Sequence, residues 1–299
     1  MSSSPEFTSS STTTSHVAAD EPPTWRPPRP TTTTTTPPPT PPAAENMTFN
    51  SPPLDVSNYP GGKKSLAGIS LRAFLIGTTL GLSASLTLTL RLFSATPLWR
   101  VPFFLASLCV FHFLEYHVTA AHNTRHASVS AFLLSSNGWA YNLAHTSAAL
   151  ECLLAYFFWP RDSYFTWSGP IAALGGLKIQ LVLGLLFMAV GQTIRTLAMA
   201  QAGSNFNHTV QVERKHGHML VTHGVYALLR HPSYFGFFWW GLGTQMVLGN
   251  VVCFVGYFVV LWKFFHSRIR REERFLIAFF GDEYVQYKKR SMVGIPGIW

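Results

Sequence analysis

Polar side chains that can do chemistry are concentrated in two segments of an otherwise apolar chain. The first, residues 202–236, reads AGSNFNHTVQVERKHGHMLVTHGVYALLRHPSYFG, and the second, residues 264–290, reads FFHSRIRREERFLIAFFGDEYVQYKKR. Polar groups beside a membrane cost free energy unless they have a use, which favours a functional site built from both segments. The alternative is that both segments are polar only because loops next to a membrane contact water.

Two charged residues of the second segment have the spacing of a helix-face pair. Arg268 and Glu272 are four residues apart, so a helix places them on one face. Glu273 is expected on another face, near Arg270 and Ile277. Taken alone, this spacing favours solvent-exposed ion pairs, each worth about 0.2–0.5 kcal/mol, over a catalytic arrangement.

Histidines raise the possibility of a metal site. His122 and His126 form H-N-T-R-H, an i, i+4 pair that can bind a cation, and His112 and His117 lie upstream. A membrane di-iron oxygenase or desaturase would show further histidine boxes, which the sequence lacks. Residues 216–218, His-Gly-His, are too close together for chelation from a helix. We therefore interpret the His122 pair as a polar helix end and predict no metal.

The composition points to a membrane protein. Of 299 residues only 12% are charged, about half the share that is usual in soluble domains. The net charge is +9 with neutral histidines, but the basic residues are scattered at the ends of apolar runs, which argues against nucleic-acid binding. Three cysteines without a C-x-x-C pair exclude a disulfide scaffold. The sequence contains no P-loop, G-x-S-x-G or G-x-G-x-x-G motif.

Apolar stretches of the length that a membrane-spanning helix needs, about 20 residues, recur after residue 65. The first four are residues 69–90, 101–121, 138–159 and 171–193. Residues 234–265 are too long for one span, and Gly249-Asn250 near their middle indicates a turn between two helices. We predict an all-α, polytopic integral membrane helix bundle of about six spans, followed by a charged, amphipathic C-terminal helix from His266.

The chain divides by composition into three parts. Residues 1–62 form a Pro/Thr/Ser-rich tail, predicted to be disordered because it offers little apolar surface to bury, and it lacks the pattern of a cleaved signal peptide. Residues 63–194 hold the first four spans. Residues 195–299 hold the two-span hairpin, the C-terminal helix and the candidate site.

The positions of basic residues predict the orientation in the membrane. They favour the even-numbered loops and the C-terminal tail, although Arg91, Arg100 and Arg161 lie in odd-numbered loops. The positive-inside rule then places both termini and the fourth loop in the cytosol. The glycosylation patterns at Asn46 and Asn207 are therefore predicted to stay unmodified.

Gly77 and Gly81 form a G-x-x-x-G pattern in the first span. Such a pair lets two helices approach closely. We favour packing within the bundle, and a homodimer contact is the alternative.

Four groups of residues follow one another from Arg195 almost to the C-terminus. They read RTLAMAQAGSNFNH, then HMLVTHGVYALLRHPSYFGFFWWGLGTQ, then FFHSRI with EE, then FFGDEY with GIP, and FHFLEYH (residues 111–117) precedes them. In order and spacing these groups closely resemble the isoprenylcysteine carboxyl methyltransferases. The resemblance covers about a third of the chain and makes residues 195–299 a methyltransferase region.

The resemblance implies a multi-pass enzyme of the endoplasmic reticulum membrane. Such an enzyme uses S-adenosyl-L-methionine to methylate the C-terminal prenylcysteine carboxylate of processed CaaX proteins. The cytosolic cofactor site is expected in the loop before the last hairpin and on the C-terminal helix. Carried over, the cofactor contacts are Gln211, His218, Met219, Leu220, Val221, Tyr226, His231, Pro232, Ser233, Tyr234 and Glu272. Arg268 is the residue expected to meet the substrate carboxylate.

Two other enzyme classes share part of this pattern. R-H-P-x-Y-x-G followed by paired glutamates also occurs in phospholipid N-methyltransferases and in some membrane sterol reductases, which are the alternatives. A non-catalytic transporter would more often show internal repeats, and none is seen. Val251 replaces a proline that is usual in the closer family, and the early end after GIPGIW is expected to make the tail contribute less.

The residue types suit methyl transfer to a carboxylate. A C-terminal carboxylate has a pKa near 3.5, so it is ionised at pH 7 and needs no general base. Its attack on a sulfonium methyl group cancels opposite charges, which favours a dry and well-aligned site. Arg268 can hold the carboxylate by a two-pronged contact and so position it. Glu272 can accept hydrogen bonds from the cofactor and offset its positive charge.

The remaining residues suit the walls of such a site. Pro232 fixes its own φ and restricts His231, which predicts a rigid ledge. Tyr226, Tyr234 and Leu220 can supply an adenine wall. A prenyl chain is strongly apolar and rests in the bilayer. Phe237, Phe238, Trp239 and Trp240 either line a groove for it or pack ordinarily against lipid or the interface.

Overall fold

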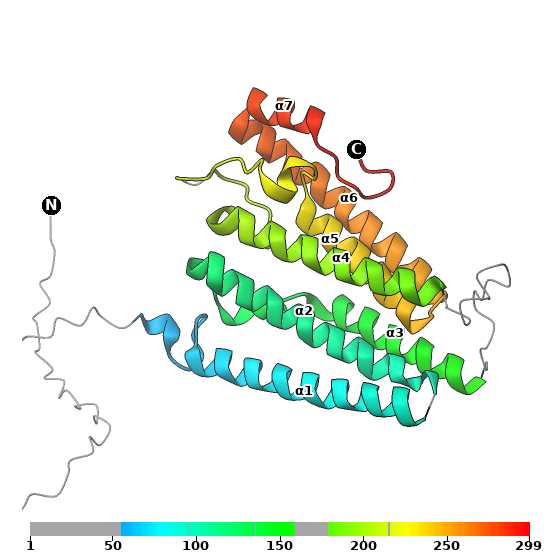
Figure 1. Cartoon of the computed structure of the whole chain (residues 1–299). Coiled ribbons are helices and arrows are strands. Elements are labelled where there is room, and N and C mark those ends of the chain that lie inside the picture. The colour runs from blue at the N-terminus through cyan, green and yellow to red at the C-terminus, as the bar shows by residue number, and fades with distance from the viewer. Residues whose placement is uncertain (1–54, 95, 135, 159–178, 215) are drawn as a thin grey trace, which may run out of the picture. The chain divides into compact units, whose positions relative to one another are not determined.

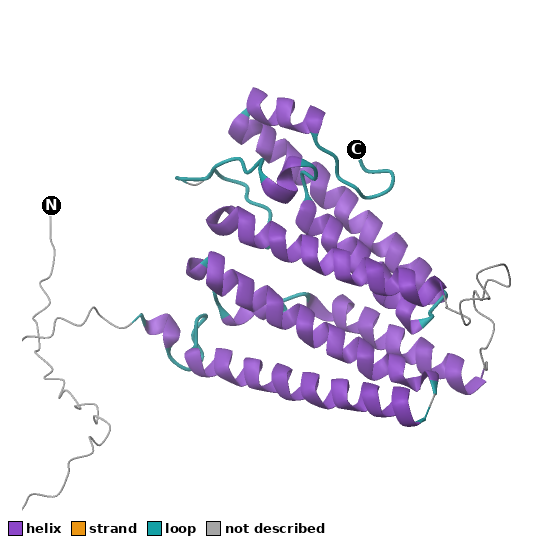
Figure 2. Cartoon of the chain, viewed as in Figure 1, coloured by secondary structure: helices purple, strands orange, loops and turns teal. Residues whose placement is uncertain are grey.

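The computed structural model describes residues 55–94, 96–134, 136–158, 179–214 and 216–299. Within these ranges all regular structure is helical (Figure 2). The N-terminal unit Met1–Ser51 lies outside the described residues, as does most of the predicted disordered tail. At the end of that tail, a short 3₁₀ turn spans Val56–Asn58.

Six long helices occur where the sequence predicts six apolar spans (Figure 1). They are α1 (Leu66–Phe93), α2 (Arg100–His122), α3 (Gly138–Phe158), α4 (Ile179–Ala202), α5 (Pro232–Leu248) and α6 (Val252–Phe280), followed by the short α7 (Asp282–Arg290). Among the described residues, four helical stretches are long and apolar enough to cross a membrane: those of α1, α2, α4 and α6. The chain is therefore an all-α integral membrane protein. The predicted beginning of the fourth span, residues 171–178, lies outside the described residues.

The turn predicted between the last two long helices is confirmed. Gly249 ends α5 with a φ of 77°, a left-handed conformation that glycine adopts without strain, and its N–H donates to the carbonyls of Gln245 and Met246. The Asn250 amide then donates to the Gln245 side chain at 2.9 Å and to the Ala148 carbonyl at 2.9 Å. These bonds tie the hairpin turn to α3.

The C-terminal helix does not begin anew at His266, as the sequence analysis expected. Instead, α6 continues from its apolar half through Phe280, where Gly281 ends it at a φ of 55°. The helix is unbroken because residues 257–280 contain neither glycine nor proline. One rigid helix thus carries both the membrane segment and the charged motif residues.

Helices α4 and α5 pack closely through glycines. A Cβ atom on Gly191 would lie 2.6 Å from the Gly236 carbonyl oxygen, and one on Gly243 would lie 2.7 Å from that of Gly184. Any side chain at these positions would push the two backbones apart. The contact therefore fixes α5, whose first turn reaches the candidate site, against α4.

The G-x-x-x-G pattern of α1 has no such role in the described part of the chain. A Cβ atom on Gly77 or on Gly81 would meet nothing within 4 Å. The favoured prediction of close packing within the bundle is therefore wrong, because α1 turns these glycines away from its neighbours. The homodimer alternative stays untested.

The C-terminal tail contributes more than the sequence analysis expected. Val293, Ile295 and Ile298 are buried in the same core cluster as Phe238 and Ile269. Their apolar side chains fill the space between the tail and helices α5 and α6, and this burial stabilises the fold. The tail thus runs back along the last two long helices (Figure 1).

The aromatic run of α5 is split between two environments. Phe238 and Trp240 are buried, with exposed fractions of 0% and 3%, and belong to core clusters. Phe237 and Trp239 are partly buried against the same clusters. Phe238 and Trp240 therefore neither line a lipid-open groove nor face lipid, because α5 is surrounded by other helices.

Candidate active site

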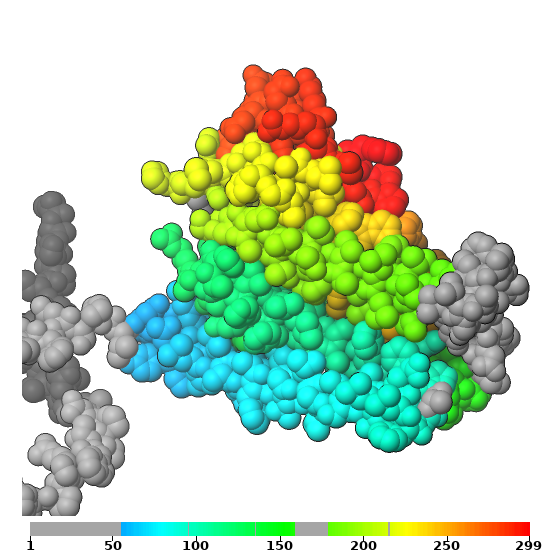
Figure 3. Space-filling view, in the orientation of Figure 1, coloured from blue at the N-terminus to red at the C-terminus, as the bar shows by residue number. Residues whose placement is uncertain are grey.

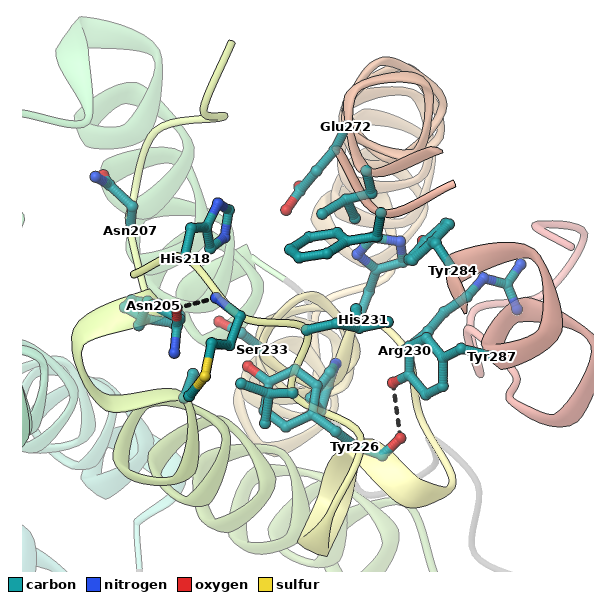
Figure 4. Close-up of a pocket in the computed structure, with 18 of the residues that line it drawn as sticks. Asn205, Asn207, His218, Tyr226, Arg230, His231, Ser233, Glu272, Tyr284 and Tyr287 are labelled. Atoms are coloured by element: carbon teal, nitrogen blue, oxygen red, sulfur yellow. Dashed lines mark hydrogen bonds between the residues drawn. The ribbon is translucent and has the colours of Figure 1, made fainter. Parts of the chain in front are cut away.

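A pocket lies between the 203–233 connection and the C-terminal half of α6 (Figure 4). It holds about 710 Å³ of empty space, a volume that includes open solvent at its mouth. Its lining residues are Ala202, Asn205, Phe206, Asn207, His218, Met219, Leu220, Val221, Tyr226, Arg230, His231, Pro232, Ser233, Tyr234, Glu272, Leu276, Phe280, Tyr284 and Tyr287. The two polar segments, far apart in sequence, therefore enclose one cavity.

The structure brings together nearly all the predicted cofactor contacts. Every one of them except Gln211 lines this pocket. Gln211 instead donates to the Thr209 carbonyl at 3.1 Å within its own loop. Arg268 does not line the pocket but hydrogen-bonds to Tyr234, which does. The other lining residues were not predicted, because their positions depend on how distant segments fold together. They are Ala202, Asn205, Phe206, Asn207, Arg230, Leu276, Phe280, Tyr284 and Tyr287.

The floor of the pocket is the turn that leads into α5. Pro232 occupies the first helical position, where a backbone N–H would have no partner within the helix, so proline costs no hydrogen bond there. The Arg230 N–H donates to the Met292 carbonyl at 2.8 Å, and the Met292 N–H donates to Leu228 at 2.9 Å. The C-terminal tail therefore fixes the extended segment before His231, and these bonds support the rigid turn that was predicted at His231-Pro232.

A buried ion pair supports the same floor from the bundle side. Arg195 of α4 forms a two-pronged pair with Glu115 of α2, and the two side chains are only 8% and 1% exposed. Arg195 also donates to Ser233 Oγ at 2.9 Å, so the pair holds a pocket residue. Its guanidinium lies 5.3 Å from the ring centroids of both Phe111 and Phe237.

The sequence analysis did not identify this pair, although a signal was present. A charged residue inside an apolar helix is costly without a partner, which marks it as a functional or organising position. Glu115 satisfies that criterion in α2, and both residues appeared only within the motifs FHFLEYH and RTLAMAQAGSNFNH, with no role of their own.

The wall formed by α6 joins three polar side chains. The Tyr234 hydroxyl donates to Glu272 Oε2 at 2.5 Å and accepts from Arg268 Nε at 2.8 Å. Arg268 and Glu272, expected to pair on one helix face, are therefore connected through the Tyr234 hydroxyl and not by a direct bond. Arg268 Nη2 also donates to the His208 carbonyl. Its Nη1 makes no hydrogen bond to the described residues, so that nitrogen can donate to a further partner.

Glu273 was expected in solvent beside Arg270, but the structure places it elsewhere. It is buried and accepts from Arg230 Nε at 2.6 Å, from His231 at 3.3 Å and from Lys288. Sequence spacing missed this because α7 folds back and brings Lys288 to the helix. The three contacts tie α6, α7 and the pocket floor together.

The third wall comes from the connection after α4. The Asn205 side chain accepts from the Met219 N–H at 3.0 Å, and the Tyr287 hydroxyl donates to the Tyr226 carbonyl at 2.7 Å. Figure 4 shows Asn205, Asn207 and His218 on the side of the cavity opposite Glu272. The loop is thus held in place by its own hydrogen bonds and by α7.

Burial keeps three ionisable side chains around this loop neutral. It raises the pKa of Tyr287 to about 12 and raises that of Tyr226 as well, so both phenols remain donors at physiological pH. Burial also lowers the pKa of His208 to about 4, against the opposing effect of Glu115. His208 is therefore neutral at pH 7, and its backbone carbonyl holds Arg268.

The histidine pair considered as a metal site does not gather further ligands. His126 Nδ1 lies 2.9 Å from the Asn123 side chain, and His122 ends α2. Within the residues that the structure describes, no group of three or more histidine, cysteine, aspartate or glutamate side chains is placed to hold a metal ion.

Comparison with known proteins decides the family. The model of the isoprenylcysteine carboxyl methyltransferase (ICMT) family matches residues 182–278. The protein-S-isoprenylcysteine O-methyltransferase of Saccharomyces cerevisiae is 41% identical over 245 residues, which are 82% of this chain and 97% of the relative. The chain belongs to the isoprenylcysteine carboxyl methyltransferase family.

Two further comparisons agree with membership of the ICMT family. The human protein-S-isoprenylcysteine O-methyltransferase is 42% identical over 230 residues, covering 77% of this chain and 75% of the relative. A solved structure of the eukaryotic intramembrane Ras methyltransferase ICMT superposes with a TM-score of 0.67 at 34% identity, covering 77% of each chain. Members of the ICMT family are S-adenosylmethionine-dependent methyltransferases.

Proposed function

We propose that this chain methylates the C-terminal carboxylate of a prenylated cysteine, and that the described pocket binds S-adenosylmethionine for that reaction. Family membership supports the activity and the substrate class, prenylcysteine proteins after CaaX processing. The observation that carries the assignment of the site is the single cavity between the two polar segments, with Arg268 bonded to its wall. We assign Glu272 and the lining residues carried over by resemblance to the cofactor, and Arg268 to the substrate.

The residues around the pocket fit this cofactor. S-adenosylmethionine supplies an electrophilic methyl group on a sulfonium when it is bound. Glu272 offers a carboxylate to donors and positive charge, and Tyr226, Leu220 and Phe280 offer apolar wall. Residues 218–221 line one edge of the cavity, where backbone groups other than the Met219 N–H, which is bonded to Asn205, can meet the adenine.

Arg268 is suited to orient the acceptor carboxylate. Two of its nitrogens are anchored, by Tyr234 and by the His208 carbonyl, which fixes the guanidinium plane. The remaining Nη1 can donate to one carboxylate oxygen while the other keeps a lone pair for attack. No proton has to be removed, so Arg268 acts by charge and position, and exclusion of water from the site favours the step.

Helix lengths support a position of this site near the edge of the bilayer core. At 1.5 Å per residue, Tyr234 lies roughly 21 Å along α5 from its last residue, Leu248, and Arg268 lies roughly 24 Å along α6 from its first residue, Val252. Both distances are below the hydrocarbon thickness of about 30 Å. A prenyl chain in the bilayer can therefore present its cysteine carboxylate to Arg268 while the cofactor enters from the aqueous side.

The membrane arrangement completes the proposal. All six long helices span the endoplasmic reticulum membrane, with both termini, the pocket and α7 on the cytosolic side. The basic flanks of the apolar runs support this orientation. The glycosylation pattern at Asn207 offers a test, because a sugar on a residue that lines the pocket would show that the orientation is inverted. The protein is proposed to act while surrounded by membrane lipid. The G-x-x-x-G pattern of α1 offers a contact for a homodimer.

One assay tests the activity directly. Purified protein in lipid vesicles is given labelled S-adenosylmethionine and N-acetyl farnesylcysteine, and we expect a base-labile methyl ester. Phosphatidylethanolamine serves as the competing acceptor. Methylation of that lipid without ester formation would favour a phospholipid N-methyltransferase, and dependence on a nicotinamide cofactor would favour a sterol reductase.

A further inference from the structure

Exposed basic side chains gather on the side of α6 that faces away from the pocket. At about 100° per residue, Arg270 and Arg274 lie roughly 160° and 200° around the helix from Glu272, which lines the pocket, and Arg271 lies roughly 100° to one side of it. All three are exposed. The opposite face carries Glu272 and the other pocket residues, so one helix presents two different surfaces.

The end of α7 adds two more cations at the same level. The Lys288 ammonium bonds to Glu273, which brings the last turn of α7 beside this part of α6. Lys289 and Arg290, which follow it, are exposed. Figure 3 shows α7 at one end of the described fold, where no other described element covers it in this view. We call Arg270, Arg271 and Arg274 the basic face of α6, and Lys289 and Arg290 add positive charge near the same end of the helix.

Acidic residues do not neutralise the basic face. Glu272 is held by Tyr234, and Glu273 is shared by Arg230 and Lys288. Asp282 and Glu283 lie at the other end of α7. Among the described residues, no ion pair joins a member of the basic face to a carboxylate.

The depth of the basic face matches that of lipid headgroups. Measured along α6 from Val252, Arg270 lies at roughly 27 Å and Arg274 at roughly 33 Å. With the opposite edge of the core set at Val252, these two residues bracket the boundary of a hydrocarbon core about 30 Å thick. Clusters of basic residues directly beyond a membrane span are attracted to anionic lipids.

We propose that the basic face binds the phosphate groups of anionic phospholipids in the leaflet from which the substrate comes. The inference rests on the proposed membrane placement of α6 but not on methyl transfer. Bound lipid on this face holds α6 at one depth, and the same rigid helix carries Arg268 and Glu272 on its other face. Lipid charge therefore sets the height at which the site meets a membrane-held carboxylate.

Binding is measured with detergent-solubilised full-length protein and short-chain phosphatidylserine, with short-chain phosphatidylcholine as the neutral probe. The test variant is Arg270→Gln/Arg271→Gln/Arg274→Gln. Its matched control, Lys63→Gln/Lys64→Gln/Arg125→Gln, removes the same charge on the same predicted side of the membrane but from other elements. We expect the apparent Kd for phosphatidylserine to rise about fivefold or more in the test variant, the effect of one engaged arginine, and to stay unchanged in the control.

Three outcomes would overturn the proposal. The first is an equal loss in the control variant, which would mean general electrostatic attraction. The second is displacement of phosphatidylserine by inorganic phosphate or by an acidic peptide at the same concentration, which would mean a free-anion or protein site. The third is binding that the test variant leaves unchanged. Arg270→Lys/Arg271→Lys/Arg274→Lys keeps the charge, and we expect it to restore binding if the glutamine variant folds poorly.

Activity in vesicles gives the second readout. Adding phosphatidylserine to phosphatidylcholine vesicles is expected to lower the KM for N-acetyl farnesylcysteine more in the wild type and the control than in the test variant. A protein without methyltransferase activity would refute the proposed function while leaving the binding measurement interpretable. The two failures are therefore distinguishable.

Discussion

Two adjacent glutamates of α6 lie in opposite environments. Glu272 lies on the pocket wall, half-buried, and accepts one strong hydrogen bond from Tyr234. Glu273 is 6% exposed and is surrounded by Arg230, His231 and Lys288. Because adjacent residues on a helix are about 100° apart, one of them can serve a ligand while the other holds three segments together. Residue type and sequence position alone do not separate the two roles.

The largest effect is expected where the structural glutamate is removed. Glu273→Ala leaves Arg230 buried without its carboxylate, and removing one partner of a buried pair costs about 3–5 kcal/mol. We expect the unfolding temperature in detergent to drop by about 10 °C, measured by thermal unfolding. Glu283→Ala, at an exposed position of α7, is the matched control, and an equal drop there would contradict the assigned role.

The pocket glutamate should affect binding rather than stability. Glu272→Ala removes an acceptor from the cavity wall, and a hydrogen bond to a charged group is worth about 1.5–3 kcal/mol. We expect the Kd for S-adenosylmethionine, measured by calorimetry, to rise about tenfold or more, with little change in unfolding temperature. A variant that melts early but binds normally would reverse the proposed division between the two glutamates.

Variants of Arg268 test whether the side of α6 that carries Glu272 also contacts the substrate. Arg268→Ala removes the anchored guanidinium, so we expect kcat to fall about tenfold while the cofactor Kd changes less. Arg268→Lys keeps the charge but loses the anchoring geometry and should recover only part of the rate. Steady-state kinetics with N-acetyl farnesylcysteine provide the measurement. Unchanged kinetics in both variants would remove Arg268 from the site.

The Tyr234 hydroxyl links Glu272 to Arg268, and its removal is expected to have the smallest effect of the four changes. Tyr234→Phe removes only the hydroxyl between Glu272 and Arg268, a change worth about 1 kcal/mol. We expect roughly fivefold effects on both the cofactor Kd and kcat. Tyr116→Phe, whose ring stacks on Phe132 away from the pocket, is the control. An effect on only one of the two constants would show that the phenol serves a single partner.

The sequence predicted much of the fold because apolar runs longer than about 20 residues leave few alternatives to membrane helices. The turn at Gly249 was also predictable, since glycine marks left-handed backbone. The continuous α6 was not predicted, because a change from apolar to charged residues looks like a boundary although no residue there breaks a helix. The α1 glycines have the G-x-x-x-G spacing and the α4 glycines lie seven residues apart, yet only the α4 glycines contact another backbone, which packing alone shows.

The candidate site was predictable where motif residues lie close together, as in His231–Tyr234. Residues such as Asn205 and Tyr287 were missed because each faces the pocket only through the fold of a distant segment. Gln211 shows the converse, since a residue carried over by resemblance lies outside the cavity lining. Glu115 was missed although a charge within an apolar helix was visible.

The sequence by itself determined that the chain is helical, that it lies in a membrane and that its polar residues gather in two segments. Composition and helix periodicity depend on residues that are close in sequence, so the sequence alone reveals them. Only the tertiary structure decided that both segments enclose one cavity, that Tyr234 joins Arg268 to Glu272, and that Glu273 faces inward. These outcomes depend on the packing of α4 against α5 and on the return of α7, which are contacts between residues far apart in sequence.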